Sequence, residues 1–347
     1  MERREFLRGA ALAGLGMASG GIASGAAAGS KSPPSPLPLS AFETIQSGIA
    51  GAEGIATAPD GRIFFSTKEA VLAVRETDGK VRHIGTPLAP TGIAADPAGR
   101  VLVANMGLLN DGPGPLQRVE PGSGQVETLV EELEGRRLLA SNCPTVARDG
   151  HVYCSHSSWG PAANIGTTDP AGFIYHLPPE GAASIVAREL RGVNGLCLDA
   201  GDRHLYAALT AEGRIVRFRR LPDGRLGERE NYGPLLGKVV ENQMVADIRA
   251  IPTKDRTDLG YCDGIAFDQA GNLWVTLPFA NRIVAITPDG RLVDIAADPD
   301  ARTIDMPTNL GWGGRGLRDL HVVCRGAGTI LRARTSIAGL PPANWPL

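Results

Sequence analysis

A short phrase of sequence returns six times along this chain, and it constrains the fold more than any other feature. Each copy has an apolar pair, a turn that carries Asp or Gly, and a β-branched or aromatic run, as in residues 54–65 and 92–103. This order is typical of two antiparallel strands joined by a tight turn. Further copies occupy residues 143–154, 195–206, 264–275 and, more loosely, 310–323. Small antiparallel sheets repeated roughly every forty to seventy residues are typical of a β-propeller, so we predict an all-β, six-bladed propeller.

The first forty residues differ from the repeats and have the pattern of an export signal with a linker. Arg3-Arg4 precede Phe6-Leu7, and a weakly apolar stretch then runs to Ala28. This order is typical of a twin-arginine (Tat) signal peptide, which we expect to span residues 1–28. The Ser/Pro-rich residues 29–40 predict a disordered linker, and residues 41–347 the propeller. We therefore expect the Tat translocase as a partner during export, a periplasmic or secreted location, and no membrane segment in the mature form.

Charge and cysteine content narrow the class of partner. The formal net charge is −2 and no basic stripe is present, which argues against nucleic acid and favours a small-molecule substrate. The five cysteines lack the C-x-x-C spacing of a zinc site. Cys143 and Cys154 flank the turn at Asp149-Gly150, so a disulfide between them and a set of buried free thiols both stay open at this point.

One position of the repeat carries the polar residues with chemical potential. In a propeller each innermost strand begins at the rim of the central channel, so the residue before each phrase faces the channel mouth. These residues are Glu53, Thr91, Asn142, Asn194, Asp263 and Asn309. Any single Asn-Gly or Asp-Gly pair is an ordinary turn. Carboxylates and amides recurring at one repeat position, without His or Cys, predict a site for one divalent cation; Ca²⁺ fits best, with Zn²⁺ or Mg²⁺ as alternatives.

The same residues carry a family resemblance. Glu53-Gly54, residues 193–196, residues 263–266 with 271–275, and the tail at 307–310 and 339–341 resemble the senescence-marker/gluconolactonase (regucalcin-like) family over nearly the whole mature chain. The resemblance implies a six-bladed propeller with one divalent metal, usually Ca²⁺, and hydrolysis of sugar lactones. It also implies Glu53, Asn194 and Asp263 as metal ligands, with Asn142 as a fourth ligand or a substrate contact.

Two departures from the family pattern bear on the substrate. Residues 140–143 read Ala-Ser-Asn-Cys and supply neither the basic residue nor the second acid usual in the third blade, so a contact to a sugar acid would be absent. Cys262 replaces the Pro that precedes the metal-binding Asp. We expect a metal-dependent lactonase in which the ion polarises the lactone carbonyl and Asp263 orients or deprotonates the attacking water. The alternatives are a phosphotriesterase-like hydrolase and a non-catalytic, calcium-binding periplasmic propeller.

Loops that follow the second strand of each blade are expected to line the same rim and to set specificity. They carry Asn105, His156 and Trp159, which with Asn142 are the predicted substrate contacts. A ring that stacks on sugar carbons beside a hydrogen-bonding imidazole suits a pocket, although both residue types also occur as packing residues. Serines in these loops lack a Gly-x-Ser-x-Gly setting, so we expect no serine nucleophile.

The segment at residues 42–49 has an alternating apolar pattern and lies before the first repeat. A propeller closes when its first and last segments share one blade, which also removes an exposed sheet edge. We therefore predict that this segment pairs with residues 330–333.

Overall fold

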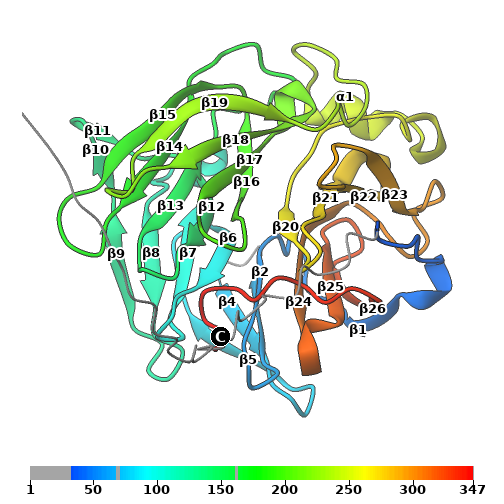
Figure 1. Cartoon of the computed structure of the whole chain (residues 1–347), viewed down its shortest axis with the longest axis horizontal. Helices are drawn as coiled ribbons and strands as arrows, with labels where there is room; N and C mark the ends of the chain where they lie inside the picture. Colours follow the sequence, from blue (N-terminus) through cyan, green and yellow to red (C-terminus); the bar gives the residue numbers. More distant parts are fainter. Residues whose placement is uncertain (1–32, 68–70, 161–162, 347) are drawn as a thin grey trace, which may run out of the picture.

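The chain forms six four-stranded antiparallel sheets around a central channel, in a computed structural model that describes residues 33–67, 71–160 and 163–346 (Figure 1). The predicted six-bladed propeller is confirmed. The export signal expected at residues 1–28 lies outside the described residues. No helix within the described ranges is long and apolar enough to cross a membrane.

In the first five blades the strands follow chain order outward from the innermost strand, and in the sixth the outermost strand is the first strand of the chain. The first blade holds β2 (Ile55–Thr57), β3 (Ile63–Thr67), β4 (Val71–Arg75) and β5 (Val81–Gly85). The second holds β6 (Pro90–Ala95), β7 (Val101–Asn105), β8 (Leu116–Val119) and β9 (Val126–Val130). The third holds β12 (Ser141–Val146), β13 (Val152–His156), β14 (Gly172–Leu177) and β15 (Ser184–Leu190).

The remaining blades follow the same plan. The fourth holds β16 (Val193–Leu198), β17 (His204–Leu209), β18 (Arg214–Arg220) and β19 (Leu226–Tyr232). The fifth holds β20 (Ile265–Phe267), β21 (Leu273–Leu277), β22 (Arg282–Ile286) and β23 (Leu292–Ala297). The sixth holds β24 (Pro307–Gly313), β25 (Asp319–Cys324), β26 (Thr329–Arg334) and, at its outer edge, β1 (Glu43–Gln46).

Short elements connect the strands. A small hairpin joins the second and third blades, formed by β10 (Glu132–Leu133) and β11 (Arg136–Arg137). The single α-helix is α1 (Val245–Ala250), between the fourth and fifth blades in the described chain. The 3₁₀ turns are η1 (Leu39–Ala41), η2 (Gly107–Asn110), η3 (Thr210–Glu212), η4 (Thr253–Asp255), η5 (Pro278–Ala280) and η6 (Arg315–Leu317).

The turns between the first two strands explain why the repeated phrase carries Asp and Gly. In the second blade, Oδ1 of Asp96 accepts the N–H groups of Ala98 and Arg100, at 2.9 and 3.0 Å. Gly99 in the same turn has φ of +80°, a conformation that costs glycine little. Asp268 accepts from the backbone of Ala270 and residue 272 in the fifth blade in the same way. The repeated phrase is therefore a local hairpin signal.

The hydrophobic core is divided among the interfaces between neighbouring blades. Strand residues alternate, so each blade presents apolar side chains to both of its neighbours. Leu102 and Leu116 of the second blade, for example, pack with Val146 and Val152 of the third. Because each blade buries its two faces only against adjacent blades, the propeller must close before both faces of every blade are buried.

Closure of the ring follows the prediction made for residues 42–49. Strand β1 pairs antiparallel with β26, with Glu43 opposite Arg332 and Thr44 opposite Leu331. The structured chain begins before residue 41, since the N–H of Leu37 donates to the carbonyl of Ile295 at 2.7 Å. The last part of the segment expected as a linker thus packs on the fifth blade.

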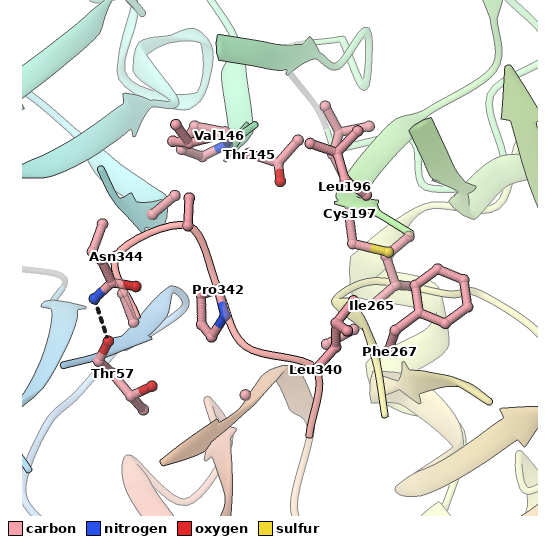
Figure 2. A pocket seen from close by; sticks show the side chains of 18 of the residues that line it. Thr57, Thr145, Val146, Leu196, Cys197, Ile265, Phe267, Leu340, Pro342 and Asn344 are labelled. Atoms are coloured by element: carbon pink, nitrogen blue, oxygen red, sulfur yellow. Dashed lines mark hydrogen bonds between the residues drawn. The ribbon is translucent and has the colours of Figure 1, made fainter. Parts of the chain in front are cut away.

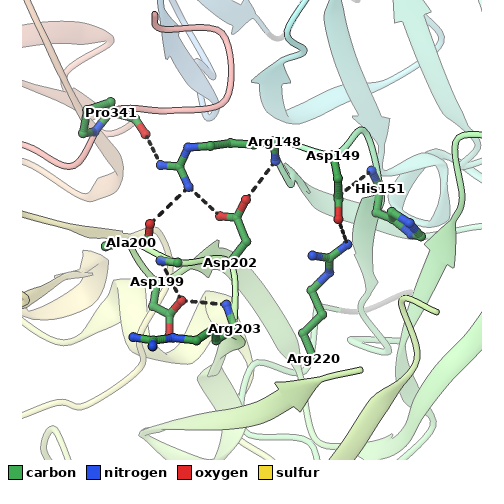
Figure 3. Close-up of polar contacts among 10 residues, drawn as sticks. Arg148, Asp149, His151, Asp199, Ala200, Asp202, Arg203, Arg220 and Pro341 are labelled. Atoms are coloured by element: carbon green, nitrogen blue, oxygen red, sulfur yellow. Dashed lines mark hydrogen bonds and ion pairs between the residues drawn. The ribbon is translucent and has the colours of Figure 1, made fainter. Parts of the chain in front are cut away.

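The C-terminal segment crosses the end of the channel at which the innermost strands finish (Figures 1 and 2). Leu340 N–H donates to Phe267 of the fifth blade at 2.9 Å, and Asn344 Nδ2 donates to the carbonyl of Thr57 in the first blade at 2.8 Å. In the third blade, Arg148 donates to the carbonyl of Pro341 at 3.3 Å (Figure 3). A cavity of about 170 Å³ remains between this segment and the innermost strands.

All five cysteines are free thiols in the structure. Cys154 lies opposite Pro144 in the β12–β13 pair, because the register shifts between Ser141 and Pro144. Cys143 and Cys154 are both buried, and burial raises the pKa of the Cys143 thiol to about 12. Of the two arrangements left open by the sequence, the structure has the set of free, mostly buried thiols.

Candidate functional site

A second and larger cavity, of about 620 Å³, occupies the channel mouth at which the innermost strands begin. Its lining includes the polar residue at the start of every innermost strand, and we call these six residues the ring. The ring consists of Glu53, Thr91, Asn142, Asn194, Asp263 and Thr308. Pockets of this size accommodate small organic ligands. The structure therefore brings together the four predicted metal-site residues in one cavity.

The ring member of the sixth blade differs by one residue from the expected Asn309. The pairing of β24 with β25 shifts by one residue between Pro307 and Asn309, as it does at the same place in the second, third and fourth blades. Thr308 is therefore the counterpart of Thr91, Asn142 and Asn194, and Asn309 takes the place of the residue that follows each of them. Thr308 then faces the cavity, and its Oγ1 donates to the carbonyl of Glu53 at 3.3 Å. Asn309 lines the cavity at the opposite end of the channel, and its Oδ1 accepts its neighbour's N–H.

Glycines let the innermost strands approach closely behind the ring. A Cβ on Gly92 would lie 2.3 Å from the carbonyl oxygen of Asn142, and one on Gly195 would lie 2.3 Å from that of Asp263. Any larger residue would push adjacent blades apart. The Asn-Gly and Asp-Gly pairs of the repeats thus place the ring residues and permit the tight channel.

Both ring amides are anchored through their nitrogen atoms. Asn142 Nδ2 donates to Ser157 Oγ at 2.8 Å, and Ser157 in turn donates to the carbonyl of Val193 at 2.5 Å. Asn194 Nδ2 lies 3.3 Å from Thr210 Oγ1, which donates to a backbone carbonyl of the next blade. In the described part of the chain, no donor is found for Oδ1 of either amide. The amide oxygens are therefore the ends available to a ligand.

The two carboxylates of the ring have different surroundings. Glu53 forms an ion pair with Arg325, which follows β25 in the sixth blade. Among the described residues, Asp263 has no ion-pair partner. Desolvation by burial raises its pKa to about 8, and its hydrogen bond with Asn194 lowers it by a smaller amount. An enclosed carboxylate without a matched positive charge favours a bound cation.

The chemistry of this donor set fits a hard divalent ion. Glu53 and Asp263 bring two negative charges, and Asn142 and Asn194 bring neutral oxygens, the ligand types that Ca²⁺ prefers. Among the described residues, no three His, Cys, Asp or Glu side chains meet in one place, so amides must complete any such set. A cation at Glu53 would compete with the guanidinium of Arg325 for that carboxylate.

The three predicted substrate contacts from the rim loops lie in different environments. Trp159 lines the cavity. Asn105 is fully buried, and its amide bonds the N–H of Ala89 at 2.7 Å and the carbonyl of Pro115 at 2.9 Å, so it holds the loop together. Neither it nor His156 is among the residues that line the cavity.

His156 supports the cavity wall from behind. Its Nε2 accepts the N–H groups of Leu139 and Ala140, at 3.2 and 3.1 Å, and its ring stacks on Phe173 with centroids 4.4 Å apart. Burial lowers the pKa of His156 to about 4, so the ring is neutral and can accept these bonds. The residue positions the backbone that leads into Asn142.

Sequence reasoning missed the role of hydroxyl groups at the ends of the second strands. They donate to the backbone carbonyls of ring residues in the next blade: Ser66 to Thr91 at 2.6 Å, Ser155 to Asn194 at 2.7 Å, and Thr276 to Thr308 at 3.0 Å. These bonds fix three of the innermost strands to the preceding blade. A hydroxyl that recurs at the same position of the second strand in the first, third and fifth blades is the signal that could have revealed them.

The fold and site define the chain as a six-bladed propeller with an oxygen-donor site at its channel mouth. It belongs to the SMP-30/gluconolactonase/LRE-like family, whose model matches residues 52–325. It is 25% identical to a 6-deoxy-6-sulfogluconolactonase of Pseudomonas putida over 270 residues, which cover 67% of this chain and 81% of the relative.

Solved structures share the architecture. A gluconolactonase of Xanthomonas campestris superposes with a TM-score of 0.64 and 20% identity, covering 85% of this chain and 89% of the other. A calcium-binding regucalcin of Agrobacterium tumefaciens gives a TM-score of 0.65 and 16% identity, with coverage of 90% and 99%. At these identities the structural likeness establishes the fold.

Proposed function

We propose that this protein is a hydrolase that opens lactones with the support of a divalent cation held by Glu53, Asn142, Asn194 and Asp263. The observation that carries the proposal is the meeting of two carboxylates and two anchored amides in one cavity at the channel mouth. Family membership and the likeness to a sulfogluconolactonase support the lactone as the class of substrate. Ca²⁺ is the ion that this donor set favours.

A cation bound by these oxygens would supply Lewis-acid activation of the lactone carbonyl and would stabilise the oxyanion formed from it. The ring residues orient the reacting groups, because Ser157 and Thr210 hold both amides in place. Water adds to the carbonyl carbon of the lactone, the C–O bond of the cyclic ester breaks, and the product is a hydroxy acid.

Asp263 is the residue that we expect to take the proton from the attacking water. Its carboxylate lines the cavity with the other three predicted ligands, so it lies in the site where the ester group and the attacking water would meet. The proton then goes to the alkoxide oxygen that forms when the lactone opens. Ser66 and Ser155 cannot serve as nucleophiles in this arrangement, because both donate to backbone carbonyls of the next blade.

The proposal is tested by combining metal binding with hydrolysis. The mature protein, stripped with EDTA, should regain one Ca²⁺ per chain by calorimetry and elemental analysis. It should then hydrolyse members of a lactone panel, followed by acid release. Glu53→Gln should weaken Ca²⁺ binding, and Asp263→Asn should lower kcat/KM by about 10²–10⁴-fold.

Asp294→Asn is a matched control, since this carboxylate is exposed on β23 and pairs with Arg282. It should bind Ca²⁺ and turn over lactones like the wild type. Normal metal loading by both ring variants would refute the site. Metal binding without turnover of any lactone would instead favour a non-catalytic propeller, and a phosphotriester in the same panel checks the other hydrolase class.

A further inference from the structure

The cavity that holds the ring has largely apolar walls. Met106 and Trp159 come from the loops of the second and third blades and pack together with Ala140, each at most 7% exposed. Phe279 from η5 belongs to a second apolar cluster on the side of the fourth and fifth blades. Ile165 packs against both clusters, which makes the wall continuous.

The hydroxyl groups of the cavity lining are already committed to the protein. Each donates its hydrogen to a backbone carbonyl: Thr67 to Val71 at 3.1 Å, Thr91 to Asn142 at 3.0 Å, Thr210 to Cys262 at 2.6 Å, Thr308 to Glu53 at 3.3 Å, and Tyr261 to Val240 at 3.2 Å. Each ring amide also commits one of its two N–H groups, that of Asn142 to Ser157 and that of Asn194 to Thr210. Among the described lining residues, Arg249 and Arg325 are the remaining side chains rich in donors, and Arg325 is paired with Glu53.

These walls would not suit a polyhydroxylated ligand. A sugar lactone carries several hydroxyl groups that lose water on entering the cavity, and each left without a partner costs about fivefold to 100-fold in affinity. An alkyl group would instead gain about fourfold in affinity for every methylene buried. The volume of about 620 Å³ leaves room for a substituent beside a six-membered ring.

We propose that the substrate is a lactone that carries an apolar alkyl or aryl substituent, with Trp159, Met106 and Phe279 as the residues that determine specificity. The lactone part of this inference rests on the proposed function. The apolar substituent rests on the residues of the cavity wall. The ring of polar residues receives the ester group, and the two apolar clusters receive the substituent.

The inference can be measured by binding, independently of turnover. Calorimetry on the Ca²⁺-loaded protein compares the lactam analogue of δ-decalactone, which has a pentyl substituent, with the lactam analogue of glucono-δ-lactone. We expect the alkyl lactam to bind at least about tenfold more tightly. Equal or tighter binding of the sugar lactam would overturn the inference.

Variants then assign the preference to the wall. Trp159→Gln and, as a second and milder change, Met106→Gln should each reduce the ratio of the two affinities by about fivefold or more. Leu235→Gln changes an apolar residue that is 56% exposed outside the cavity and should leave the ratio unchanged. An unchanged ratio in both wall variants would also contradict the assignment.

Hydrolysis distinguishes this inference from the proposed function. δ-Decalactone should exceed glucono-δ-lactone in kcat/KM by at least about tenfold. If no lactone is hydrolysed but the alkyl lactam still binds more tightly, the lactonase proposal fails and the apolar specificity stands. If glucono-δ-lactone is the better substrate, lactone hydrolysis stands and the apolar specificity fails.

Discussion

Single residues in this propeller do their work by occupying buried positions with defined partners. His321 on β25 is 4% exposed, and no partner is found for its Nδ1 among the described residues. Burial lowers its pKa to about 4, and nearby arginines add to the effect while Asp319 opposes it. The neutral ring is therefore the form that the fold accommodates, and protonation would bury an unpaired charge.

The first prediction at this scale concerns stability against pH. Between pH 6.5 and 4 the unfolded chain takes up a proton at His321 that the folded chain refuses, so the free energy of unfolding should fall as the pH falls. The separation of the two pKa values corresponds to about 3 kcal/mol as an upper bound. The free energy of unfolding, measured with urea at pH 4.5 and 7, should change less between the two pH values for His321→Gln than for the wild type.

His83→Gln serves as the control, because His83 is exposed on β5. Its pH dependence should match that of the wild type. Equal slopes for His321→Gln and the wild type would show that His321 does not carry this linkage.

Among the elements, the four-residue strand β1 closes the propeller. It supplies the outer strand of a blade whose other three strands come from the end of the chain. Phe42 and Ile49 on either side are 8% and 7% exposed, and they pack in the clusters that flank the sixth blade. The ion pair of Glu43 with Arg332, at 2.7 Å, is exposed and adds little.

We predict that two N-terminal truncations differ sharply in stability. Deletion through residue 49 removes β1, Phe42 and Ile49, exposes the edge of β26, and should cost about 3–6 kcal/mol. Deletion through residue 32 keeps the buried Pro34 and Leu37, whose N–H bonds Ile295, and should be neutral. Thermal melting with Ca²⁺ present should therefore separate the midpoints by roughly 10 °C. Coincident midpoints would contradict closure through β1.

At the scale of the whole molecule, the C-terminal segment connects the blades of the propeller a second time. That segment bonds the fifth blade at Phe267, the third through Arg148, and the first at Thr57. Arg148 is itself held by Asp202 of the fourth blade, at 3.0 Å (Figure 3). The C-terminal segment from residue 340 onward, which we call the strap, thus crosses the end of the channel opposite the candidate site and contacts blades that are far apart in the sequence (Figure 2).

We expect deletion of residues 340–347 to lower the melting temperature without changing lactone preference. Several interblade hydrogen bonds and the packing of Leu340 are lost together, so the cost should be about 2–4 kcal/mol. Arg148→Gln removes one link and should cost less. Melting curves and the affinity ratio of the two lactams test both points, and a changed ratio would mean that the strap also shapes the site.

The sequence by itself determined the features that arise within one repeat. Hairpin phrases identified the six blades, and their common starting position identified Glu53, Asn142, Asn194 and Asp263 as neighbours across the channel. The alternating segment before the first repeat identified the closing strand. Such features follow from local turn chemistry and strand periodicity, which each repeat expresses independently.

Only the tertiary structure decided the features that depend on contacts between blades. Packing behind the cavity wall engaged His156 with the backbone N–H groups of Leu139 and Ala140. The ion pair of Arg325 with Glu53 joins residues from opposite ends of the chain. Hydrogen bonds and ion pairs between distant segments are set by the closed propeller as a whole, so no local pattern records them.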